Sequence, residues 1–161
     1  MKYVTFCSAP GVGTPPHRIW EILPGQRQFE LFRESIRRVD HDASFVILTD
    51  PETDFLIEDS DTVVIRRPVD HSEIMLERSR RQLDFLEKYA FNSPVVFADT
   101  DMLFLAPLDR VFDKEFDVAL TLRSDDDMPI NGGLILVSDR QPKRSIDFFR
   151  RLVSKMESES K

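Results

Sequence analysis

Six short apolar runs are spread along the chain, and each has the length and composition of a β-strand. They are YVTFCS (3–8), SFVILTD (44–50), TVVIRRP (62–68), PVVFAD (94–99), FDVALTL (116–122) and INGGLILVS (130–138). The runs are continuous rather than alternating, which is typical of strands that are buried on both faces of a sheet. The chain is therefore expected to fold as an α/β layered structure.

Helical patterns lie between and after these runs, at 26–39, 71–91 and 142–157. Parallel strands need crossover connections of this length, so the helices are expected to flank a mostly parallel central sheet. In the second pattern apolar residues recur at roughly helical spacing, and Ser72 is the expected N-cap.

Length and composition indicate one folded domain over residues 1–161. Hydrophobic residues make up 41% and charged residues 32% of the chain, the balance of an ordinary globular protein. The formal net charge of −7 argues against nonspecific nucleic-acid binding and is compatible with a bound divalent cation.

Cys7 is the single cysteine of the sequence, which excludes an intrachain disulfide and a thiolate metal cluster and fits a reducing compartment. The N-terminal MKYVTFC lacks the features of a signal peptide, and no apolar stretch has the length of a membrane span. A cytoplasmic location is expected.

The loop after the first run, APGVGTPPH (9–17), does not match the dinucleotide-binding fingerprint, because it lacks the third glycine and contains two prolines. In open α/β sheets, ligands bind beyond the carboxyl ends of the strands. Asp99 and Asp101 lie at such an end, and Ser8 and Asp50 lie at others.

The sequence VVFADTDMLFLAP (95–107) places two aspartates, separated by one residue, inside an apolar stretch. Carboxylates in this arrangement can hold Mg²⁺ or Mn²⁺, which prefer oxygen ligands and commonly keep substrate phosphates as further ligands. If the strand continued through them, both would lie on the same side. A polar strand end or turn is the alternative reading of the pair.

The surroundings of this pair make the pattern more specific. An apolar strand, Asp-Thr-Asp, a second apolar strand, a proline and a short helix are followed about thirty residues later by Asn-Gly-Gly, which opens another strand. In this order the motifs resemble those of nucleotide-sugar-dependent glycosyltransferases of the GT-A fold, especially family-8-like members. The resemblance implies a Rossmann-like GT-A fold and transfer of a sugar from a nucleotide diphosphate to a glycan, lipid or protein acceptor.

The resemblance also assigns roles to residues of the two motifs. Asp101 would bind Mn²⁺ or Mg²⁺ at the nucleotide diphosphate, Asp99 would contact the ribose or the metal, and Thr100 would belong to the same nucleotide-sugar site. Asn131, Gly132 and Gly133 would line the sugar or acceptor pocket, since glycine permits close backbone approach. A β-bulge or turn is the alternative explanation of the two glycines.

Other candidate residues come from neighbouring elements. Arg78 and Arg81 share one face of the second helix, where family members often direct a cation toward the diphosphate; a salt-bridged solvated face is the alternative. The resemblance implies that Ser8, Ala9 and Asp50 occupy the positions of base and ribose recognition; a loop cap is the alternative. The acidic run 125–127 is expected to be a solvated loop or to contact a sugar hydroxyl.

The histidines at 17, 41 and 71 are expected to be exposed polar residues. The family commonly has a histidine near its C-terminus at the metal site and an Asp-Gln element in the acceptor pocket, and this sequence has no counterpart after its last helix. A compact variant, a shortened chain and a fragment that binds nucleotide-sugar without efficient transfer are the three explanations.

Two further functions remain open. One is a noncatalytic nucleotide-sugar-binding or interaction domain. The other is a haloacid-dehalogenase-like phosphatase, whose nucleophile motif is also an apolar strand ending in D-x-D, with Thr121 and Lys143 as further residues. The short stretch after Asp101 and the missing acidic pair after Lys143 argue against the phosphatase.

Overall fold

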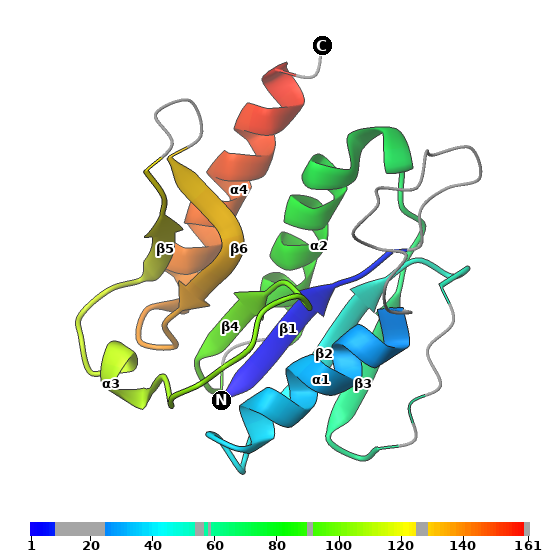
Figure 1. The fold of residues 1–161 in the computed structure, drawn as a ribbon. Coiled ribbons are helices and arrows are strands. Elements are labelled where there is room, and N and C mark those ends of the chain that lie inside the picture. The colour runs from blue at the N-terminus through cyan, green and yellow to red at the C-terminus, as the bar shows by residue number, and fades with distance from the viewer. Residues whose placement is uncertain (9–24, 54–56, 58, 90–91, 125–128, 160–161) are drawn as a thin grey trace.

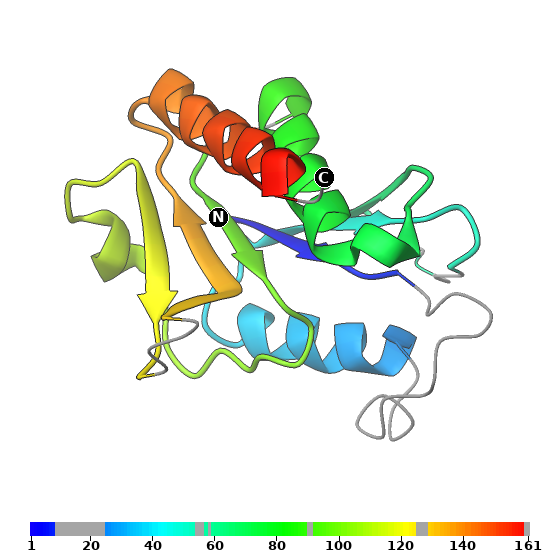
Figure 2. The same cartoon turned by 90° about the horizontal axis from the view of Figure 1, so that it is seen from above.

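The computed structural model describes residues 1–8, 25–53, 57, 59–89, 92–124 and 129–159. Its elements follow in the order β1 (Lys2–Phe6), α1 (Gly25–Arg37), β2 (Ser44–Thr49), β3 (Thr62–Arg66), the 3-10 turn η1 (His71–Glu73), α2 (Ile74–Tyr89), β4 (Val95–Ala98), α3 (Asp109–Phe112), β5 (Val118–Leu122), β6 (Ile130–Val137) and α4 (Pro142–Glu159). The sheet forms the middle of three layers, with α1 on one face and with α2 and α4 on the other (Figures 1 and 2).

The six described strands form one sheet in the order β3-β2-β1-β4-β6-β5. Strands β1 to β4 are parallel to one another, whereas β6 is antiparallel to both of its neighbours, β4 and β5. The predicted α/β fold, a mostly parallel central sheet with flanking helices, is confirmed. Because β6 is reversed, its first residues lie at the sheet edge where β4 ends.

The continuous apolar runs are explained by burial on both faces of the sheet. In β4, Val96 and Ala98 pack in the core beneath α1, whereas Val95 and Phe97 pack in the core beneath α2 and α4. Phe97 meets Phe85 of α2 edge to face, with ring centroids 6.1 Å apart. Because side chains alternate along a strand, Asp99, which directly follows β4, is directed toward the α2 face, where it meets Arg78.

Burial is weaker at the sheet margins. Edge strand β3 leaves Val63 exposed, and β5 at the other margin ends in exposed Leu122. The expectation of burial on both faces therefore applies to the central strands and not to the edges.

The apolar segment after the aspartates does not form the second strand that its composition suggests. Leu103 and Leu105 are 63% and 90% exposed, while Phe104 between them is buried. The Phe104 amide donates to Ser35 Oγ of α1 at 3.1 Å, and the Phe104 ring packs edge to face on Phe32. Strand β4 is already paired on both sides, by β1 and β6, so this segment passes over the α1 face instead.

The second helix begins differently from the prediction. Asp70, not Ser72, is the N-cap of the η1 turn, and its carboxylate accepts from the Ser72 amide at 2.9 Å and from the Ser72 hydroxyl at 2.6 Å. An aspartate at this position suits the positive end of a helix.

Among the described residues, no helix combines the length and the apolar character needed to cross a bilayer.

Candidate functional site

The aspartate pair lies in a turn at the carboxyl end of β4. The strand stops at Ala98, and the Met102 amide donates to the Asp99 carbonyl at 3.2 Å, so the chain reverses through Thr100 and Asp101. Thr100 is buried, Asp99 is partly buried and Asp101 is exposed. The two carboxylates are thus not placed by a continuing strand, as period-two geometry would require, but by a turn.

Arg78 of α2 is directed at this turn. Its guanidinium forms an ion pair with Asp99 Oδ1 at 2.9 Å and donates to the main-chain carbonyl of Gly132 in β6. The Arg78 side chain is 14% exposed and the Asp99 side chain is 36% exposed, so the guanidinium is mostly buried while the carboxylate keeps access to solvent. One side chain therefore connects α2, the end of β4 and the start of β6.

Strand β6 has a bulge at the position where Arg78 and Asp99 meet it. Its pairing with β5 skips residues 132–134, because Leu120 faces Ile135 while Thr121 faces Asn131. The Thr121 hydroxyl lies within donor distance of two β6 carbonyls, Asn131 at 2.9 Å and Leu134 at 3.3 Å. Bulges are frequent next to functional sites because they redirect backbone groups.

The Asn-Gly-Gly motif forms one wall of the site through its backbone. The Asp99 amide donates to the Gly133 carbonyl at 2.9 Å, and the Gly133 amide donates to Asn131 Oδ1 at 2.9 Å. A Cβ atom on Gly133 would lie 3.0 Å from Asp99 Oδ2 and 3.1 Å from Asn131 Oδ1, whereas one on Gly132 would meet nothing within 4 Å. Only Gly133 is therefore required by close packing against the carboxylate.

The electrostatics of Asp99 reflect opposing influences. Burial raises the pKa of the Asp99 carboxyl, the nearby Arg78 guanidinium lowers it, and the Asp101 carboxylate raises it again, with a net increase. The ionised form of Asp99 is therefore less stable here than in water, because the carboxylate is partly buried and lies near a second one. A further cation would relieve this cost.

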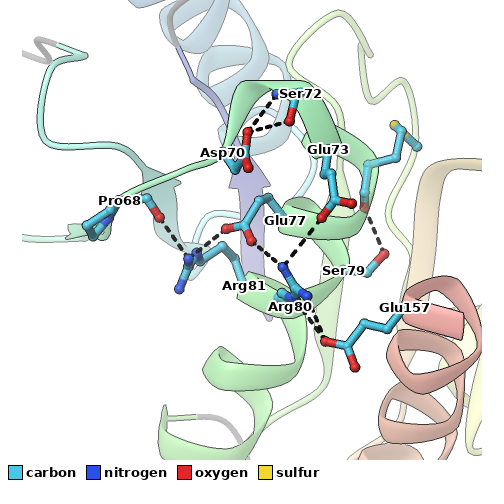
Figure 3. Close-up of polar contacts among 10 residues, drawn as sticks. Pro68, Asp70, Ser72, Glu73, Glu77, Ser79, Arg80, Arg81 and Glu157 are labelled. Atoms are coloured by element: carbon cyan, nitrogen blue, oxygen red, sulfur yellow. Dashed lines mark hydrogen bonds and ion pairs between the residues drawn. The ribbon is translucent and has the colours of Figure 1, made fainter. Parts of the chain in front are cut away.

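Arg81 does not reach the site, although it shares a helix with Arg78. The Glu77 carboxylate pairs with Arg80 at 2.8 Å and with Arg81 at 2.7 Å, and Arg81 also donates to the Pro68 carbonyl (Figure 3). Arg80 continues the network to Glu157 of α4. The salt-bridge alternative thus describes Arg81, while Arg78 lies at the aspartate pair.

Ser8 and Asp50 form a second cluster at the same sheet edge. The Asp50 carboxylate accepts from the Ser8 hydroxyl at 2.6 Å, from the Thr53 hydroxyl and amide at 2.6 Å each, and from the Glu52 amide at 2.7 Å. Burial raises the pKa of Asp50, but these donors outweigh it and lower the pKa to about 2. The geometry is that of a loop cap, the alternative given above for this position.

The remaining candidates do not join either cluster. Ala9, His17 and the acidic run 125–127 lie outside the described residues. His41 is exposed, in the turn between α1 and β2, and His71 is partly exposed in η1.

The residues that would hold Mn²⁺ or Mg²⁺ are Asp99 and Asp101. Within the described ranges there is no group of three or more His, Cys, Asp or Glu side chains arranged to hold a metal ion. Both cations are commonly bound through one or two carboxylates together with substrate phosphates, and the Asp101 side chain makes no hydrogen bond or ion pair with any described residue. The donor set at the turn therefore fits such a cation.

The two phosphatase candidates are not brought to the aspartates. The Thr121 hydroxyl is engaged with the β6 backbone. Lys143 lies at the start of α4, and Val137, which ends β6, pairs with Val95 at the beginning of β4. Lys143 is therefore at the opposite end of the sheet from Asp99.

The sequence does not reveal the role of Thr121 in the bulge. A threonine at a strand end carries no signal for a hydrogen bond to a neighbouring strand, because that contact depends on the β5–β6 register. The only hint is its position ten residues before Asn131, at the end of the apolar run that precedes the Asn-Gly-Gly motif.

No family model matches the sequence, and no curated protein matches it. Solved structures do match the fold. The glycosyltransferase GlyE of Streptococcus pneumoniae TIGR4 gives a TM-score of 0.60 at 14% identity, covering 99% of this chain and 39% of that one. The galactosyltransferase LgtC, solved in complex with donor and acceptor sugar analogues, gives a TM-score of 0.57 at 12% identity, covering 97% of this chain and 66% of that one.

The chain thus has the α/β fold of GT-A glycosyltransferases and spans between about two fifths and two thirds of the length of these two structures.

Proposed function

We propose that this chain is a metal-dependent glycosyltransferase domain that takes a sugar from a nucleotide diphosphate donor and passes it to a glycan, lipid or protein acceptor. The observation that carries the proposal is the meeting of Asp99, Arg78 and the β6 bulge at the carboxyl edge of the sheet. That edge is where open α/β sheets bind their ligands. The glycosyltransferase fold of the neighbours supports the same reading.

The chemistry follows from where charge develops in such a reaction. When a sugar leaves its diphosphate, negative charge grows on the leaving group, so groups that favour that charge accelerate the step. Asp99 and Asp101 would hold Mn²⁺ or Mg²⁺, which supplies Lewis-acid stabilisation of the diphosphate when bound. Arg78 is a fixed cation beside them. The bulge from Asn131 to Gly133 would line the sugar side of the pocket.

The first experiment is a thermal-unfolding screen with UDP, GDP and their sugars, with and without Mn²⁺. A ligand at about 100 times its Kd raises the free energy of unfolding by roughly 2.7 kcal/mol, which is readily visible as a higher Tm. We expect a stabilisation by one nucleotide that requires Mn²⁺. Transfer is then measured with that nucleotide's sugar, and hydrolysis of the donor is followed where the acceptor is unknown.

Asp101→Ala should abolish the Mn²⁺-dependent stabilisation while leaving the Tm of the free protein unchanged, because this side chain is exposed and has no partner among the described residues. Asp42→Ala is the matched control, since Asp42 is also exposed but lies in the turn before β2, at the other end of the sheet. Equal binding by Asp101→Ala and the wild type would refute the metal role. Nucleotide binding without turnover would favour the noncatalytic binding domain.

A further inference from the structure

Arg78 already neutralises one of the two carboxylates that would share a cation. Its guanidinium is paired with Asp99 Oδ1 at 2.9 Å, and the second interaction, with the Gly132 carbonyl, fixes it in that position. Asp101 has no such partner among the described residues. The free site therefore holds two carboxylates and one guanidinium, which together leave a single negative charge.

This arrangement is less favourable for a divalent cation that arrives alone than the same two carboxylates without Arg78 would be. A cation on the Asp99 carboxylate would be close to the Arg78 guanidinium, and two positive charges repel each other more strongly where solvent is partly excluded. A diphosphate removes the difficulty, because its negative charges interact favourably with the metal and with the guanidinium at once.

Resting on the function proposed above, we propose that Arg78 is a counter-ion that weakens binding of free divalent cation and couples metal binding to diphosphate binding. In the free chain it substitutes for the metal at Asp99. When metal and diphosphate bind together, it serves as a second cation to the phosphates. The site then responds to the metal–nucleotide pair more strongly than to either component.

The position of Arg78 explains why this role belongs to it and not to its neighbours on α2. Arg80 and Arg81 are both held by Glu77, whose side chain is 7% exposed, and they face the loop before η1 and the end of α4. Arg78 is held instead by Asp99 and the β6 bulge. Arg81→Met is therefore a matched control, because it removes an arginine three residues away and leaves Glu77 paired with Arg80.

The test measures two affinities at about pH 8. Mn²⁺ alone is titrated into the protein and followed by loss of the free-ion EPR signal, and UDP or GDP is titrated calorimetrically at saturating Mn²⁺. In Arg78→Met, we expect Mn²⁺ alone to bind on the order of tenfold more tightly than in the wild type, and the nucleotide on the order of tenfold more weakly. Arg78→Lys should restore weak Mn²⁺ binding, because it keeps the charge, and Arg81→Met should change neither affinity.

The opposite signs separate this role from a structural one, since a loosened site would weaken both ligands. Equal or weaker Mn²⁺ binding in Arg78→Met than in the wild type overturns the counter-ion role while the proposed function stands. If neither protein binds Mn²⁺, the proposed metal site itself is wrong and the inference falls with it. Circular dichroism of each variant verifies folding, and Arg78→Gln replaces Arg78→Met if the latter unfolds.

Discussion

Two aspartates at the same edge of the sheet have opposite environments. Asp50 follows β2 and its carboxylate accepts four hydrogen bonds from Ser8, Glu52 and Thr53, which lower its pKa to about 2. Asp99 follows β4, has Arg78 as its ion-pair partner, and has a raised pKa because burial dominates.

The difference shows that position at a strand end does not by itself make a binding residue. Asp50 is followed by residues whose amides and hydroxyl fold back onto it, as aspartates in turns commonly allow, so its charge is used to shape the loop. Asp99 is followed by a turn that carries a second carboxylate outward. An ionised carboxylate that its own loop does not satisfy is the one that gains from a ligand.

The largest expected effect is on stability, and it distinguishes Asp50 from Asp99. Asp50→Ala should lower the free energy of unfolding by about 3 kcal/mol, because it removes the acceptor of four partly buried hydrogen bonds. Asp99→Asn should change it by no more than about 1 kcal/mol, because burial already works against the charged form. Urea denaturation measures the first property, and Mn²⁺-dependent nucleotide binding, expected to be lost only in Asp99→Asn, measures the second.

If Asp50→Ala also lost nucleotide binding with its fold intact, Asp50 would be a ligand residue and the contrast would fail. Asp50→Asn serves as the milder control, since its amide oxygen can still accept from the loop amides.

The second prediction concerns acid stability. The folded-state pKa of Asp50, about 2, is below the usual value of 3.8, so this group stabilises the folded protein above about pH 4. That contribution, about 2 kcal/mol, is lost as the pH falls toward 2. Urea denaturation between about pH 5 and pH 2 should show a steeper loss for the wild type than for Asp50→Ala. Parallel curves would mean that the hydrogen bonds to Asp50 do not depend on its charge.

The smallest effect tests the close packing around Asp99. In Gly133→Ala the new methyl would lie 3.0 Å from Asp99 Oδ2, so the carboxylate must move. We expect a loss of about 1 kcal/mol in stability and a roughly fivefold loss in Mn²⁺-dependent nucleotide affinity. Gly132→Ala is the control, because its Cβ would meet no atom within 4 Å. Equal stability and equal nucleotide affinity of the two variants would show that Gly133 is not closely packed against the Asp99 carboxylate.

Much of the fold could be predicted because the signals are local. Each apolar run overlaps a strand of the sheet, and each helical pattern overlaps a helix whose bounds lie within a few residues of the predicted ones. The prediction of a strand around Phe104 was wrong, because Phe104 packs against α1 and the segment has no free strand edge to join. The cap at Asp70 was missed because Ser72 is equally suitable from the sequence.

The candidate site was less predictable, because its contacts cross the sheet. Helical spacing places Arg78 and Arg81 on one face of α2. In the structure, however, Arg81 forms an ion pair with Glu77 of the same helix, while Arg78 forms one with Asp99 at the end of β4. The two aspartates were found from a motif, but the turn that separates their side chains was not.

The sequence by itself determined the strands, the α/β class and the presence of an acidic pair at a strand end, because continuous apolar runs, helical periodicity and local charge are properties of neighbouring residues. Tertiary structure decided which arginine meets that pair, that Asp50 serves its own loop, and that Thr121 engages the β6 bulge. These outcomes depend on strand register and on the competition of several partners for one charge. Such competition is resolved only when distant segments are brought together.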